Sequence, residues 1–140
     1  MTSGEIALVQ ESLRKLAPIS DSAIALFYAR WFELDPELRG CCRGAMAVEN
    51  HRLMRSIVSI VARLESFEAL RPSLRRIGAR QSWRGLSEEH YATAGAAFLW
   101  TLERTLGTAF TPAVKAAWTR CYVEVATAMM DGAQMTRKAA

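Results

Sequence analysis

Residues 26–40 read LFYARWFELDPELRG, and this stretch decides the fold class. Its aromatic residues recur at helical spacing and define one apolar face of a helix that ends near Leu34. Asp35 followed by Pro36 is typical of an N-cap with proline at the first helical position, so we expect a short helix there that ends by Gly40. A helix followed at once by another helix is typical of an all-α protein.

Helix-capping and helix-breaking residues predict helices along the rest of the chain as well. Thr2 and Glu5 form a capping-box pattern for a first helix that stops before Pro18. No segment shows the strict alternation of a strand. We expect loops at 41–45 and 82–86 and helical segments at 2–17, 20–34, 35–40, 46–64, 67–80, 87–107 and 111–132.

Length and composition favour one globular domain over residues 1–140, with a polar tail from about residue 133. The chain has 140 residues, of which 51% are hydrophobic, enough for one buried core. It contains no apolar run of the roughly twenty residues that cross a bilayer, and no basic start followed by an apolar block. We therefore expect a cytoplasmic protein without a membrane partner. Three cysteines without metal-ligand spacing predict reduced thiols.

The net charge of +4 comes mainly from arginines, which are densest at positions 71, 75, 76, 80 and 84. No helix-turn-helix pattern, zinc-finger pattern or glycine-rich loop accompanies this cluster, so we expect no nucleic-acid partner. A solvated helix face is the simplest interpretation, and an anionic ligand or an acidic partner is the alternative.

Four blocks of sequence resemble a known family, in the family's order. They read LFYARWFELDPELRG, ENHRLM, IGARQSWRGLSEEHY and TLERTLGTAFTPAVKAAWTRCY. The chain resembles bacterial single-domain globins and the globin domain of flavohaemoglobins, from Ile6 to Met130. This resemblance implies a globin fold, with six to eight helices around an interior haem-type pocket.

The resemblance also implies which residues line the gas-binding side of that pocket. Tyr28 falls at the distal tyrosine position, with Phe27 beside it. Glu49 falls at the distal position that usually carries histidine or glutamine. Leu53 follows one helical turn later, at the apolar distal position.

Two positions depart from the family pattern. Gln81 stands where the family has its iron-ligating histidine, and a carboxamide is a much weaker iron donor than an imidazole. Cys42 stands where the family has a phenylalanine that packs on the porphyrin, so a large apolar contact is lost. Both departures predict weaker retention of haem.

The opposite side of the pocket is altered too. Tyr91 keeps the family's tyrosine below the proximal ligand, but Ala133 stands where the family has the acidic residue of that polar group. His90 and Cys42 are the reserve candidates for iron ligation. His90 can instead cap its own helix, and Cys42 can instead be a small packing residue.

Two functions remain open from the sequence. The first, which the sequence favours, is a non-haem globin that binds a small apolar or anionic molecule or a protein partner, with homodimerisation possible. The alternative is a globin that binds haem b through atypical, non-histidine ligation and acts in gas or redox sensing or nitrogen-oxide chemistry. No catalytic constellation is present, so an enzyme without haem is not expected. If haem is absent, we expect the segment Phe67–Arg80 to collapse into the pocket.

Overall fold

The computed structural model is all-helical in the part of the chain that it describes, residues 1–40, 46–83 and 86–139. Within these ranges, nothing is described of the side chains of residues 39–40, 46–51, 81, 83 and 136–139. The α-helices are α1 (Ser3–Leu16), α2 (Ser20–Leu34), α3 (Met46–Ala62), α4 (Phe67–Trp83), α5 (Glu88–Leu106) and α6 (Pro112–Ala139). Short 3-10 turns are η1 (Ala17–Ile19), η2 (Pro36–Gly40), η3 (Leu64–Ser66) and η4 (Gly107–Ala109). The prediction of an all-α fold is confirmed.

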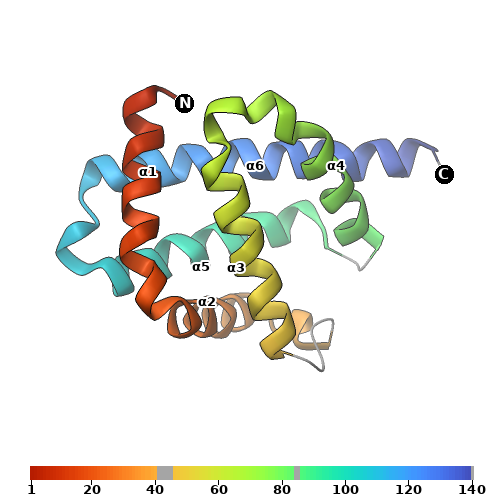
Figure 1. Cartoon of the computed structure of the whole chain (residues 1–140). Helices are drawn as coiled ribbons and strands as arrows, with labels where there is room; N and C mark the ends of the chain where they lie inside the picture. The colour runs from red at the N-terminus through yellow and green to blue at the C-terminus, as the bar shows by residue number, and fades with distance from the viewer. Residues whose placement is uncertain (41–45, 84–85, 140) are drawn as a thin grey trace.

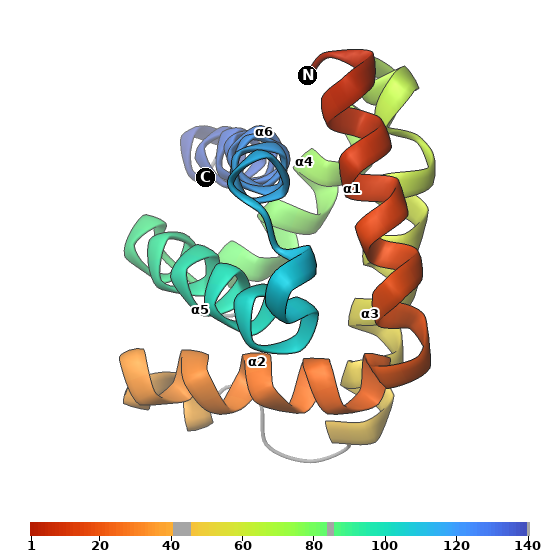
Figure 2. The same cartoon turned by 90° about the vertical axis from the view of Figure 1, so that its left-hand side faces the viewer.

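The helices enclose a shared interior. In Figure 1, α5 and α6 run across the molecule, and α4 lies beside the C-terminal half of α6. Figure 2 shows α2 below α5, with α1 and α3 together on the side away from the C-terminus. Helices at steep angles to one another leave room for an interior pocket.

Local signals fix where the helices begin and end. The Thr2 hydroxyl accepts a hydrogen bond from the Glu5 amide at 3.1 Å, and Glu5 Oε1 accepts one from the Thr2 amide at 2.8 Å. This reciprocal pair is the predicted capping box. Gly107, with φ of 56°, ends α5 in a backbone region that favours glycine.

Helix α6 continues to Ala139, so the prediction that it frays after Gly132 is wrong. Its C-terminal half packs along α4 at very close range. A Cβ atom at Gly132 would lie 2.0 Å from the backbone oxygen of Arg75. Because glycine permits this approach, α4 supports the extra turns of α6. Ala133, expected in a polar tail, is only 4% exposed.

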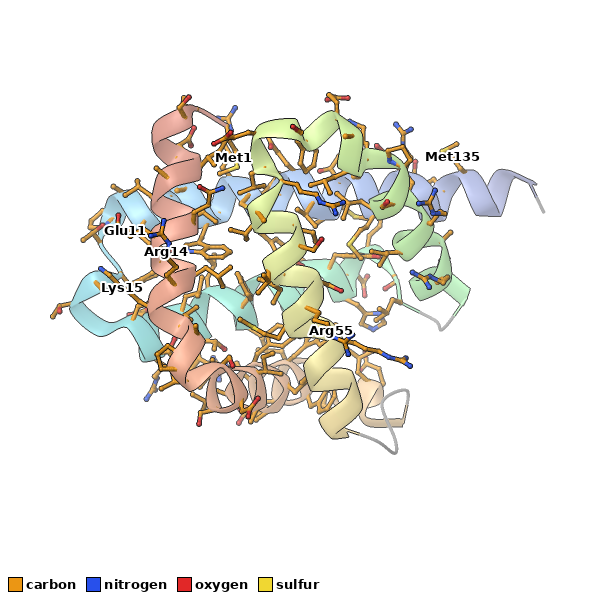
Figure 3. All side chains as sticks on the ribbon, in the orientation of Figure 1. Met1, Glu11, Arg14, Lys15, Arg55 and Met135 are labelled. Carbon is orange, nitrogen blue, oxygen red and sulfur yellow. The ribbon has the colours of Figure 1, made fainter. Side chains whose placement is uncertain are left out.

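Charged side chains face outward where the amphipathic pattern predicts. Figure 3 shows Glu11, Arg14 and Lys15 on the outer face of α1, while Val9 on the opposite face is fully buried. In the arginine cluster, Arg71 donates to the Glu68 carboxylate at 2.8 Å, as expected of a solvated helix face. No helix in the described ranges is both long enough and apolar enough to span a membrane.

Candidate functional site

An interior cavity of about 460 Å³ lies between the helices. All six α-helices contribute side chains to its wall, and most of these side chains are apolar. Arg52 and Arg80 are exposed residues in the wall, so the cavity reaches the surface beside them. The volume falls within the ~300–1,000 Å³ that is usual for ligand and cofactor pockets.

Helix α2 supplies one side of the cavity through its aromatic face. Phe27 and Tyr28 are both 9% exposed, and their ring centroids lie 5.3 Å apart. Leu53, on α3, is half-buried and also lines the cavity. The Trp31 indole donates a hydrogen bond to the Thr93 hydroxyl at 3.2 Å, which ties α2 to α5. The structure therefore brings together three of the residues that the resemblance assigns to the distal side.

Helix α5 contributes Tyr91, whose hydroxyl is buried. Its oxygen has no hydrogen-bond partner among the described residues, although the Tyr91 carbonyl accepts one from the Tyr122 hydroxyl at 2.6 Å. Burial raises the pKa of the Tyr91 phenol, so the group is a neutral donor near pH 7. An unsatisfied buried hydroxyl is costly and marks a place where a bound group can supply a partner.

The remaining predicted pocket residues are only partly described. Gln81 lies in the last turn of α4 and Glu49 in the first turn of α3, but their side chains are outside the description. Cys42 lies outside the described residues altogether. The assignments of these three residues therefore stay predictions from the resemblance.

The segment Phe67–Arg80, for which we expect collapse if haem is absent, forms most of α4 and packs on α6, and a cavity lies beside it. The collapse concerns a haem-free chain and stays a prediction. A Cβ atom at Gly78 would lie 1.8 Å from the Met129 backbone oxygen, so α4 is held tightly against α6.

His90 lines the cavity but has protein partners at both ring nitrogens. Nδ1 accepts a hydrogen bond from the Ser87 amide at 2.9 Å, completing a capping box for α5. Nε2 lies 3.1 Å from Glu37 Oε1. Ligation of iron by His90 would require one of these contacts to break.

Sequence reasoning missed part of the cavity wall. The helical spacing predicts that Arg52 faces water, and it is exposed, but it also lines the cavity mouth together with Arg80. Position 52 directly precedes Leu53, so a pocket drawn around Leu53 could have included it. Cys121 is 4% exposed and lines the cavity too.

The described part of the chain is all-helical and encloses a mainly apolar interior cavity. The globin family model matches residues 43–129, more than half of the chain. The chain belongs to the globin family.

Relatives and solved structures are similar over most of the chain. A neuroglobin of Chaenocephalus aceratus is 27% identical over 121 residues, covering 76% of this chain and 76% of the relative. A flavohaemoprotein of Vibrio cholerae is 25% identical over 134 residues, covering 94% of this chain but only 34% of its own length. An engineered carbene transferase from Rhodothermus marinus, assigned as a nitric oxide dioxygenase, has a TM-score of 0.87 at 21% identity, covering 99% of this chain and 97% of its own.

A bacterial globin from Campylobacter jejuni has a TM-score of 0.85 at 20% identity, covering 98% of this chain and 99% of its own. At these identities the two structures show the shared fold. Haem is the cofactor that the globin family normally binds. The apolar cavity and the unsatisfied Tyr91 hydroxyl fit such a group, whereas glutamine at position 81 does not offer the usual imidazole.

Proposed function

We propose that this chain is a haem-binding globin with atypical axial ligation. It would act in gas or redox sensing or in nitrogen-oxide chemistry rather than in oxygen transport. The observation that carries this proposal is the open cavity of about 460 Å³ with Tyr28, Leu53 and Tyr91 in its wall. The flavohaemoprotein relative and the structural neighbour assigned as a nitric oxide dioxygenase favour the same class of chemistry.

Apolar residues would hold the macrocycle, because burial of apolar surface contributes about 25 cal/mol per Å². Phe27 and Leu53 supply such surface from α2 and α3. Arg52 and Arg80, exposed in the cavity wall, are suited to pair with carboxylates of the cofactor. When bound, haem supplies an iron centre that binds small gas molecules and changes oxidation state.

The polar residues would set the ligand chemistry. Tyr28 places a phenol on the α2 side of the cavity, and Tyr91 directs a neutral hydroxyl at the other side. Gln81 offers only a weakly basic amide oxygen to iron. We therefore expect the proximal position to be open or held by water, which disfavours ordinary reversible oxygen carriage.

The test is titration of the purified, haem-free chain with haem while the absorption spectrum is recorded. We expect saturation at one haem per chain with a sharp Soret band. Leu53→Trp fills the cavity and should abolish saturable uptake. Val58→Trp is the matched control, because Val58 lies on the same helix but is 47% exposed.

Two results would contradict the proposal. One is uptake that never saturates, and the other is uptake that Leu53→Trp leaves unchanged. An apolar or anionic molecule that copurifies with the chain and resists displacement by haem would favour the non-haem function instead.

A further inference from the structure

Two carboxylates and one imidazole, which are typical metal-ligating groups, lie close together where the end of α2, η2 and the start of α5 meet. Asp35 follows α2, Glu37 lies in η2, and His90 lies in the first turn of α5. One ligand atom from each lies within 4.8 Å of the other two. The sequence gives no sign of this cluster, because His90 is 53 positions away from Glu37.

Residues outside the cluster hold two of its members in place. The Thr93 hydroxyl donates to Asp35 Oδ2 and itself accepts a hydrogen bond from the Trp31 indole. On the other side, Ser87 contacts His90 Nδ1 through its amide at 2.9 Å and its hydroxyl at 3.2 Å. The His90 side chain is only 13% exposed, so its ring is fixed with Nε2 towards Glu37. Metal ligands are typically oriented by such outer hydrogen bonds.

The charge of the cluster also favours a cation. Two carboxylates lie together, and in the described part of the chain neither forms an ion pair with lysine or arginine. One imidazole nitrogen with carboxylate oxygens is a donor set suited to zinc, which binds both at about 2.0–2.2 Å.

We propose that Asp35, Glu37 and His90 form a binding site for a zinc ion, with water as the fourth ligand. The three ligand atoms all lie within 4.8 Å of one another, so small side-chain rotations bring them around a tetrahedral ion. Zinc takes the place of the proton on Nε2, and the ring proton moves to Nδ1. The Ser87 amide then gives up its hydrogen bond to Nδ1, and the Ser87 hydroxyl accepts one from it instead. The site joins the end of α2 to the start of α5.

The test is calorimetric titration of the haem-free, full-length chain with Zn²⁺. We expect one saturable site that His90→Gln and Glu37→Gln each weaken at least about tenfold. Glutamine at position 90 keeps the capping-box pattern with Ser87, and glutamine at position 37 keeps an acceptor for Nε2. Thermal unfolding without zinc should confirm that both variants are folded.

Two control substitutions test whether the loss of zinc affinity is specific to the proposed ligands. Glu89→Gln removes a neighbouring exposed carboxylate, and His51→Gln removes the other histidine of the sequence, so neither should change zinc affinity. A ¹⁵N NMR spectrum should show His90 Nε2 shifting on zinc addition. Absence of saturable binding, or equal affinity in the parent, Glu37→Gln and His90→Gln, would overturn the proposal.

Discussion

The indole N–H of Trp118 is buried and donates to the Ser12 hydroxyl at 2.7 Å. Ser12 in turn donates to the Leu8 carbonyl at 2.8 Å, so one small residue links α1 to α6. Ser12→Ala leaves the indole without its acceptor and should lower the free energy of unfolding by about 1–3 kcal/mol. Urea denaturation of this variant and of Ser22→Ala, an exposed serine, checks the prediction. Equal losses in both variants would contradict it.

Cys121 makes stability depend on pH at the alkaline end. Burial, together with the nearby Glu124 carboxylate, raises the pKa of the thiol from 9.0 to about 12. The folded state then keeps the thiol proton between these values, while the unfolded state loses it. Stability from this group is complete below pH 9 and falls as pH rises towards 12, at up to about 1.4 kcal/mol per pH unit.

Cys121→Ala should flatten part of this decline, measured as the midpoint of urea unfolding from pH 8 to 11. The rest of the slope should persist, since burial also raises the pKa of Tyr122. A slope identical in parent and variant would show that the thiol ionises equally in both states.

At the scale of elements, the crossing of α4 over α6 depends on glycine. Gly132→Ala would place a Cβ atom 2.0 Å from the Arg75 backbone oxygen, and a backbone atom cannot rotate away. We expect a loss of about 1–3 kcal/mol in unfolding free energy, as is usual for overpacking. Gly4→Ala is the control, because its nearest neighbour would be a Thr2 atom at 3.8 Å. A control loss as large as that of Gly132→Ala would refute this account.

Most element boundaries could be predicted from local signals. Thr2 with Glu5, Pro112 and Gly107 act through contacts a few residues away, which a sequence reader can see. The extent of α4 and α6 could not be predicted, because it depends on packing between Gly132 and Arg75, which are distant in sequence.

At the scale of the whole molecule, Tyr28, Leu53 and Tyr91, which the resemblance assigns to the pocket, all line one cavity. The resemblance did not predict the juxtaposition of His90 with Glu37, because this contact arises only when α5 meets η2.

Restoring the family's proximal histidine should strengthen haem binding. Gln81→His supplies an imidazole, and Cys42→Phe supplies an aromatic contact, so their effects on the free energy of haem binding should be close to additive. Competition for haem with an apo-globin of known affinity measures both. If Gln81→His binds haem no more tightly than the parent, loss of the histidine does not limit haem retention.

The most direct test of the central claim is resonance Raman spectroscopy of the ferrous, haem-loaded chain, which detects an iron–histidine stretching band. We predict no such band in the parent and its appearance in Gln81→His. An iron–histidine band in the parent would contradict the account, since it would show that His51 or His90 ligates the iron in place of the residue at position 81.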